Sequence, residues 1–269
     1  MREYLAELVN QTTTPLEGRN TAREYLQARI LNSLQQQGAF VPLAFLGGTA
    51  LRFLFHINRF SEDLDFSLES KSKDFQFSGF LTRLESDLSA EGYPIEIKVK
   101  FDHIVQSALV RFPGLLFAVG LSQHENEIIS IKIEVDTNPP AGAGLAITTI
   151  RHYATLRIQH YDQASLLAGK IHAVLQRRFD KGRDMYDLLW YLSDRSWPPP
   201  NLVMLNNALV QTGWEGEKLT QDNWKTLLLE KLIGVQWDQI RNDVRPFVES
   251  TETIQLLTLA TFENLLDKA

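Results

Sequence analysis

The sequence predicts a protein of two parts, with mixed α/β structure up to about residue 155 and only helices after it. Two observations predict this division. Between residues 41 and 135, short apolar runs alternate with amphipathic stretches of helical period. Beyond residue 157, only the helical period remains. We therefore expect an α/β (α+β) domain with a mixed sheet over residues 1–155 and an all-α helical domain over residues 156–269.

Helices and strands alternate in the first part. Apolar residues at helical spacing predict a helix over residues 21–37, which Gly38 ends, and a buried strand over residues 41–46. Gly47-Gly48 break this strand before a short helix over residues 49–55. The other elements predicted here are strands over residues 64–68, 95–99, 104–112 and 128–135, and a helix over residues 80–88.

Two amphipathic helices open the second part. Asp162 is a suitable N-cap for a helix over residues 163–178, and Gly182 separates it from a second helix that runs to about residue 192. The segment WPPP at residues 197–200 must interrupt helical structure, because proline cannot continue a helix. At least three more helices are expected between this segment and residue 269.

Composition excludes several classes of protein. The chain has 269 residues, of which 44% are apolar and 22% charged, as in ordinary globular proteins. There is no cysteine, which excludes disulfides, cysteine-ligated zinc, iron–sulfur clusters and thiol catalysis. The six histidines lack the spacing of a zinc site. No apolar run approaches the roughly 18 residues of a membrane helix. We therefore expect a cytoplasmic protein that does not enter a membrane.

Charge is unevenly distributed along the chain. The net charge is −6, yet residues 151–183 contain seven Lys or Arg against two Asp. One interpretation is an anionic ligand held at this place. The other is a solvated face of a helix, and charge alone does not decide between them.

A glycine pair and a carboxylate pair follow one another in the sequence. A buried strand ends at Gly47-Gly48 and a short helix begins there, so backbone N–H groups can approach an anion closely. Asp63 and Asp65 are two residues apart at the next predicted strand, which places both on one face. Paired carboxylates on one face suit one or two Mg²⁺ ions. Either pair alone is common, whereas their joint order favours a function.

A third acidic group comes from the strand predicted over residues 128–135. Lys132, Glu134 and Asp136 share one face of this strand, and the apolar residues between them share the other. An ordinary half-buried strand with a solvated face explains the alternation equally well. Both Glu134 and Asp136 therefore stay open as the third carboxylate.

Charged residues also recur on the two helices of the second part. Lys170 and Arg177 are seven residues apart on one helix face. Asp184 and Asp187 share a face of the next helix, together with Tyr191. Two packed amphipathic helices with Arg–Asp pairs, such as Arg183 with Asp187, would give the same pattern.

Three segments together carry a resemblance to a known family. GGTAL at residues 47–51, RFSEDLDF at residues 59–66 and KGRDMYDL at residues 181–188 are similar to the motifs of the AbiEii/AbiGii nucleotidyltransferase toxins of type IV toxin–antitoxin systems. That family has a minimal form of the DNA polymerase β-type nucleotidyltransferase fold. The resemblance implies this fold for the N-terminal domain.

The resemblance also implies roles for individual residues. The residues implied to bind the NTP are Gly47, Gly48, Thr49, Ser61 and Lys170. Those implied to be catalytic are Asp63, Asp65, Glu134 and Asp184, of which Asp63, Asp65 and Glu134 (or Asp136) would hold Mg²⁺ or Mn²⁺. Candidates for binding a polyanionic acceptor are Arg177, Arg178, Lys181 and Arg183.

The activity implied is transfer of a nucleoside monophosphate from an NTP to an acceptor hydroxyl, with the tRNA 3′ end as acceptor. The protein would be the toxin of a toxin–antitoxin or phage-defence pair. Its partner would be a winged-helix antitoxin similar to AbiEi, which can act without a stable complex. The residues leave other functions open: modification of a protein or small molecule, transfer of the γ-phosphate, or non-catalytic binding of a nucleotide or protein.

Overall fold

The computed structural model describes residues 2–69, 75–101 and 103–268, which form two compact units. Unit 1 contains the described residues up to His56, with Phe60–Asn138 and Ile147–His160. Unit 2 contains Ile57–Arg59, Pro139–Ala146 and the described residues from Tyr161 onward. The units thus draw on separate stretches of the chain, and the predicted boundary between residues 155 and 156 stays a prediction.

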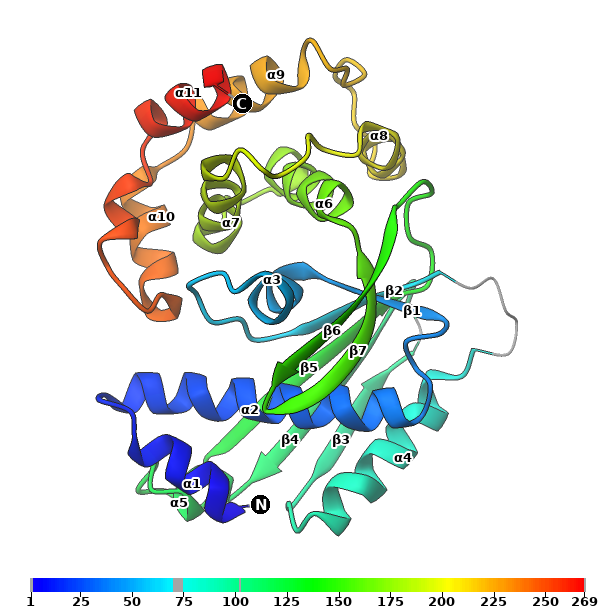
Figure 1. The fold of residues 1–269 in the computed structure, drawn as a ribbon, viewed down its shortest axis with the longest axis vertical. Coiled ribbons are helices and arrows are strands. Elements are labelled where there is room, and N and C mark those ends of the chain that lie inside the picture. Colours follow the sequence, from blue (N-terminus) through cyan, green and yellow to red (C-terminus); the bar gives the residue numbers. More distant parts are fainter. Residues whose placement is uncertain (1, 70–74, 102, 269) are drawn as a thin grey trace. The chain divides into compact units, whose positions relative to one another are not determined.

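A seven-stranded sheet of order β3-β4-β5-β2-β1-β7-β6 forms the centre of unit 1 (Figure 1). Strand β2 pairs in parallel with β5 and antiparallel with β1, so the sheet is mixed, as predicted. The strands are β1 (Leu43–Leu46), β2 (Leu64–Leu68), β3 (Glu96–Lys100), β4 (Val105–Pro113), β5 (Ile128–Asp136), β6 (Leu145–His152) and β7 (Ala154–Tyr161).

The helices of unit 1 are α1 (Arg2–Asn10), α2 (Pro15–Gln36), α3 (Gly47–Phe55), α4 (Phe77–Ala90) and α5 (Leu115–Ala118). Helix α2 begins six residues before the predicted start. The Thr14 hydroxyl accepts a hydrogen bond from the Glu17 N–H at 3.1 Å, and Pro15 occupies the first turn, so this cap fixes the beginning. Helices α2 and α4 pack against each other and against the sheet (Figure 1).

Strand β5 separates the core from the polar face of the sheet. Its side chains Ile129, Ile131, Ile133 and Val135 are buried in the apolar core of unit 1. Lys132 and Glu134 alternate with them and are half-buried on the other face. Apolar residues therefore fix the register of β5, and this register places its charged residues.

Strands β6 and β7 were not predicted. Strand β6 is exposed along most of its length, and Ile147 in it is 58% exposed. In β7, Leu156 and Ile158 are buried, but the predicted change to helix at residue 157 falls within this strand. An edge strand with few buried residues gives only a weak alternation signal, which explains the omission of β6.

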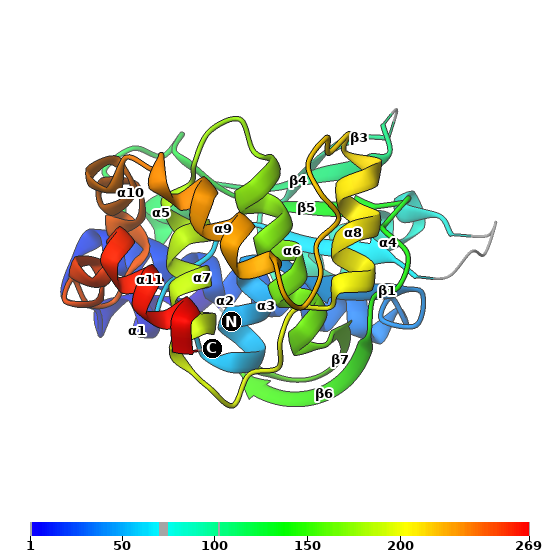
Figure 2. The same cartoon turned by 90° about the horizontal axis from the view of Figure 1, so that it is seen from above.

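Unit 2 is helical, as predicted. Helices α6 (Gln163–Gln176) and α7 (Gly182–Ser193) pack together, and the remaining helices lie around this pair (Figure 2). These are α8 (Leu202–Gln211), α9 (Trp224–Ile233), α10 (Trp237–Val244) and α11 (Leu259–Lys268), with short 3₁₀ turns η1 (Arg245–Phe247) and η2 (Thr253–Leu256). Asp162 caps α6, because its carboxylate accepts from the Ser165 N–H at 2.8 Å, as the sequence indicated.

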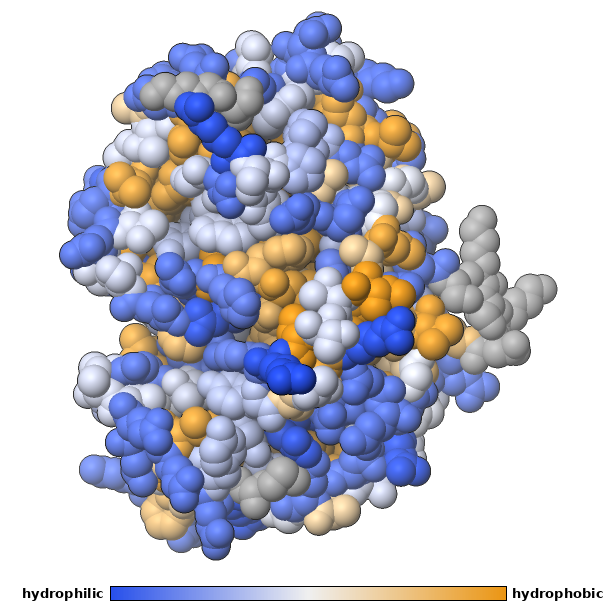
Figure 3. Space-filling model, viewed as in Figure 1, coloured by the Kyte–Doolittle hydropathy of each residue, from blue (hydrophilic) through white to orange (hydrophobic). Residues whose placement is uncertain are grey.

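The surface is mostly polar on the face seen in Figure 3, where apolar side chains occur in separate patches. In the described stretches of the chain, every helix is too short or too polar to cross a lipid bilayer.

Candidate active site

The glycine turn at the start of α3 lies directly against a predicted metal ligand. Gly47 has a backbone φ of +80°, in the left-handed region that favours glycine. A Cβ atom at this position would lie 2.2 Å from Oδ2 of Asp65. Only glycine therefore allows both this turn and the observed position of the Asp65 carboxylate.

Two of the predicted carboxylates are neighbours in the sheet. Asp65 in β2 and Glu134 in β5 are register partners on parallel strands, which lie about 4.8 Å apart in a sheet. Asp63 comes two residues before Asp65, immediately before β2 begins at Leu64. The next register pair on the same face of the sheet is Ser67 with Asp136. The register thus brings Glu134, rather than Asp136, beside Asp65.

Asp136 has a different environment. Its Oδ1 accepts a hydrogen bond from the Asn138 N–H at 2.9 Å, within the turn that ends β5. Burial raises the pKa of the Asp136 carboxyl. Of the two residues that the sequence left open, Glu134 therefore has the position expected of a third metal ligand.

A lysine on the same face neutralises part of this acidic charge. Lys132 Nζ lies 2.7 Å from Oε1 of Glu134. The hydrogen bond to Glu134 raises the pKa of the Lys132 ammonium, and the charges of Asp63 and Asp65 raise it further. All three carboxylates therefore act on one cation.

The donor set has the chemistry that Mg²⁺ requires, since carboxylate oxygens are its usual protein ligands. Among the described residues, however, no three acidic or histidine side chains converge into a ready-made metal site. Glu134 is directed toward Lys132 by the ion pair described above. Binding of a divalent cation here would therefore have to displace the Lys132 ammonium from Glu134.

The backbone just before Asp65 is held by two buried side chains. The Gln27 amide, on α2, donates to the carbonyl oxygens of Ser61 and Glu62, each at 3.0 Å. The Thr49 hydroxyl, on α3, donates to the carbonyl oxygen of Asp63. Three successive carbonyls are thus fixed by side chains that are 1% exposed or less. Because the Thr49 hydroxyl is engaged in this contact, the nucleotide contact predicted for Thr49 would have to come from its backbone N–H group.

Sequence reasoning missed Gln27. The sequence contained a signal, because the polar residues Asn20, Glu24 and Gln27 follow helical spacing. The structure shows that all three are buried. Glu24 accepts hydrogen bonds from Arg52 Nε at 2.6 Å and pairs with His152 at 2.9 Å. The polar residues on this face of α2 therefore support the chain around the predicted site.

In unit 2, Lys170 lies between two aspartates. Its Nζ is 2.7 Å from Oδ2 of Asp187 and 3.1 Å from Oδ1 of Asp184. Burial alone would lower the pKa of Lys170, but the charges of Asp187 and Asp184 outweigh it and raise the pKa. Lys170 is therefore a cation at neutral pH.

Asp184 also contacts Arg177, whose Nη1 lies 2.9 Å from its Oδ2. Burial would raise the pKa of the Asp184 carboxyl, but the charges of Lys170 and Arg177 lower it. The predicted residues Lys170, Asp184 and Arg177 thus form one cluster.

Asp187 has a second partner that sequence reasoning missed. Arg59 donates two hydrogen bonds to it, at 2.5 and 2.6 Å, and neither side chain is more than 2% exposed. Asp187 thus pairs with a residue far away in the sequence, whereas the Arg183 guanidinium lies over the Phe247 ring at 4.4 Å. In the sequence, only the position of Arg59 within the RFSEDLDF motif indicated that this residue has a role.

The other predicted acceptor-binding residues lie at the junction of α6 and α7. Arg177, Arg178 and Lys181 are exposed, and Arg183 in the first turn of α7 is half-buried.

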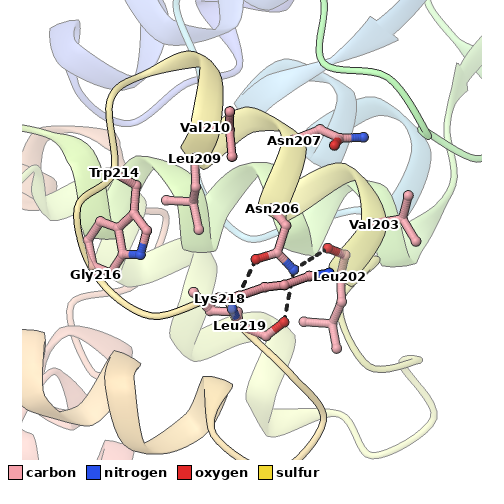
Figure 4. A pocket seen from close by; sticks show the side chains of 10 residues that line it. All are labelled: Leu202, Val203, Asn206, Asn207, Leu209, Val210, Trp214, Gly216, Lys218 and Leu219. Atoms are coloured by element: carbon pink, nitrogen blue, oxygen red, sulfur yellow. Dashed lines mark hydrogen bonds between the residues drawn. The ribbon is translucent and has the colours of Figure 1, made fainter.

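A separate pocket of about 570 Å³ lies on α8 and the segment that follows it (Figure 4). Asn206 closes one side by hydrogen bonds to the backbone of Leu202 and Leu219, while Val203 and Trp214 contribute apolar surface. In the part of the chain that the structure describes, no predicted site residue lines this pocket.

Comparison with known protein families assigns the chain to one of them. The family described as "Nucleotidyl transferase AbiEii toxin, Type IV TA system" matches residues 29–268. The chain belongs to the AbiEii toxin family. Its members are nucleotidyltransferases, so this AbiEii protein is a nucleotidyltransferase toxin of the type IV toxin–antitoxin class. No functionally curated protein matches the chain.

Two solved structures have the same fold as this AbiEii protein. JHP933 from Helicobacter pylori is 20% identical, with a TM-score of 0.55 over 93% of this chain and 92% of that one. A candidate nucleotidyltransferase from H. pylori is 21% identical, with a TM-score of 0.51 over 91% of this chain and 94% of that one. At these identities the similarity shows the fold alone, which confirms the predicted nucleotidyltransferase-like fold.

Proposed function

We propose that this AbiEii toxin transfers a nucleoside monophosphate from an NTP to an acceptor hydroxyl at Asp63, Asp65 and Glu134. The observation that carries the proposal is the pairing of Asp65 with Glu134 in the sheet, beside the Gly47 turn. These three carboxylates would hold Mg²⁺ or Mn²⁺. A divalent cation bound there supplies charge neutralisation on the phosphates and a lower pKa for the attacking hydroxyl.

The nucleotide is bound by the glycine turn, Ser61 and Lys170. Backbone N–H groups of Gly47, Gly48 and Thr49 lie in the first turn of α3, where helix geometry directs them toward an anion. Ser61, beside Asp63, is a further phosphate contact. Lys170 stabilises the triphosphate charge, and Asp184 assists catalysis by keeping Lys170 charged and oriented.

The acceptor is the 3′ end of tRNA, which reacts in the cytoplasm, where NTPs and tRNA occur together. Arg177, Arg178, Lys181 and Arg183 belong to the basic stretch that suits this polyanion. The partner of the toxin is a winged-helix antitoxin similar to AbiEi, as type IV membership suggests.

The experiment is transfer of ³²P from each of the four α-labelled NTPs into total tRNA in the presence of Mg²⁺. Asp63→Ala, Lys170→Ala and Asp184→Ala should lose transfer, because Asp63 holds the metal, Lys170 acts on the phosphates and Asp184 keeps Lys170 charged and oriented. Asp238→Ala is the matched control, since this carboxylate is 93% exposed in unit 2 and pairs with Arg241 on its own helix.

Label in tRNA that depends on the three residues would support the proposal. A folded wild type that transfers no α-label to tRNA would exclude this acceptor. Transfer of label from γ-³²P-NTP instead would show a phosphotransferase and overturn the proposed reaction.

A further inference from the structure

An exposed aromatic ring lies among cations between the two helices of the Lys170 cluster. We name residues 177–181, which join α6 to α7, the basic loop. Phe179 in this loop is 81% exposed. Arg178 and Lys181 are exposed as well, and the Arg177 side chain is 41% exposed.

The basic loop is fixed at both ends. Arg177 contacts Asp184 at 2.9 Å, which ties the beginning of the loop to a predicted catalytic group. At the other end, the Gly182 N–H donates to Oδ2 of Asp243 at 2.6 Å. Asp180 is paired with Lys231 at 3.7 Å, so the only acidic residue of the loop is already compensated. The loop therefore presents its ring and its cations together, beside the cluster.

A single exposed apolar residue needs no special explanation, but this combination does. Proteins that bind single-stranded nucleic acid combine cations along the backbone with aromatic rings on which bases stack. In a chain with a net charge of −6, three cations in five residues favour a polyanion. An acidic peptide would satisfy the charges, whereas a flat ring beside them matches the face of a base.

We propose that Phe179 is a stacking platform for a base near the 3′ end of a single-stranded RNA acceptor, whose phosphates contact Arg178 and Lys181. The identification of this RNA as the acceptor rests on the proposed function. Binding itself does not, because the loop lies wholly in unit 2 and needs neither NTP nor metal.

The test is binding of a fluorescein-labelled single-stranded RNA of about twelve nucleotides, within the usual site sizes, measured by anisotropy over a series of salt concentrations. Phe179→Ala should weaken binding about tenfold, because one stacked base is lost. Phe179→Trp should keep the wild-type affinity for RNA, whereas Phe179→Leu should lose affinity as Phe179→Ala does. Arg178→Ala should weaken binding and reduce its salt dependence by about one phosphate contact. Phe179→Ala should leave the salt dependence of binding unchanged.

The control is Phe117→Ala, which removes a 45% exposed ring on α5 and should not alter binding. The proposal would be overturned if Phe179→Ala or Phe179→Leu bound RNA as tightly as the wild type does. It would also be overturned if the wild type had no affinity for RNA. If Phe179 supports RNA binding while no NMP transfer occurs, the stacking site stands and the proposed function falls. Binding of an acidic peptide in place of RNA would assign the loop to a protein partner and overturn the stacking site.

Discussion

Gly47 is the residue whose substitution tests the contact between turn and carboxylate most directly. Gly47→Ala should abolish binding of Mn²⁺ with NTP, since the new methyl group would occupy the position of the Asp65 carboxylate. Gly38→Ala is the matched control: Gly38 has a φ of +73°, and nothing lies within 4 Å of an added Cβ. Both variants should lose about 1–2 kcal/mol of stability from the left-handed backbone. Electron paramagnetic resonance measures the binding of Mn²⁺. Equal binding by Gly47→Ala and Gly38→Ala would show that the Gly47 turn is not needed for the metal site.

Lys132 should oppose metal binding before the nucleotide arrives. Lys132→Met removes the ammonium that Glu134 contacts at 2.7 Å, so Mn²⁺ should bind about tenfold more tightly to the free protein. Lys98→Met, a change of an exposed lysine on β3, should have no effect. A titration followed by electron paramagnetic resonance measures both affinities, and weaker binding by Lys132→Met would show that Lys132 supports the site instead.

Residues near one another in the sequence could be predicted, and distant partners could not. The GGTAL and SEDLDF segments indicated Gly47, Asp63 and Asp65 because each pattern is local. Arg59 and Asp187 are 128 residues apart, so their buried pair depends on the fold. The choice between Glu134 and Asp136 likewise required the register of β2 with β5.

At the level of elements, α2 holds the segment that carries Asp63. Gln27→Leu removes both hydrogen bonds to the Ser61 and Glu62 carbonyls, so amide hydrogen exchange in residues 60–68 should accelerate. Ser33→Ala is the matched control, because Ser33 is a buried polar residue of α2 that instead donates to Asp87 on α4. Each change should cost about 1–2 kcal/mol of stability. Equal exchange rates of this segment in both variants would refute the positioning role.

Asp184 on helix α7 should make the free energy of unfolding depend on pH. The pKa of Asp184 is lowered in the folded protein because Lys170 and Arg177 outweigh the effect of burial. Its contribution is therefore complete above the ordinary aspartate pKa of about 4 and is lost as the pH falls through the lowered value. Asp184→Asn should be less stable than wild type at pH 7, by about 1–3 kcal/mol, and the difference should shrink in acid. Urea unfolding at several pH values measures it, and a difference that grows in acid would contradict this assignment.

Elements with strong periodicity were predicted closely, while the start of α2 and the edge strand β6 were not. Helix α6 and strand β5 agree with their predicted ranges to within two residues. Helix α2 began early because Thr14 and Pro15 cap it, and β6 was missed because most of an edge strand is exposed. The cap of α2 is a local signal in the sequence that the predicted start overlooked, whereas an edge strand leaves little local signal.

At the scale of the whole molecule, the two units are not two halves of the chain. Residues 57–59 belong to the helical unit although they lie between α3 and β2, and Arg59 holds them there through Asp187. The basic stretch that composition revealed contains Lys170 and the basic loop, together with part of the sheet. Composition thus indicated a charged region, while the fold divides this region between unit 1 and unit 2.

If Asp65 and Glu134 together support nucleotidyl transfer, the loss of either carboxylate should stop the reaction. The most direct measurement is the Mg²⁺-dependent release of pyrophosphate from NTP in the presence of tRNA. Asp65→Asn and Glu134→Gln should each reduce the rate at least about 100-fold, as loss of a group that stabilises transition-state charge does, while Asp136→Asn should retain most of it. Retention of activity in Glu134→Gln with loss in Asp136→Asn, or wild-type activity in Asp65→Asn, would contradict the account.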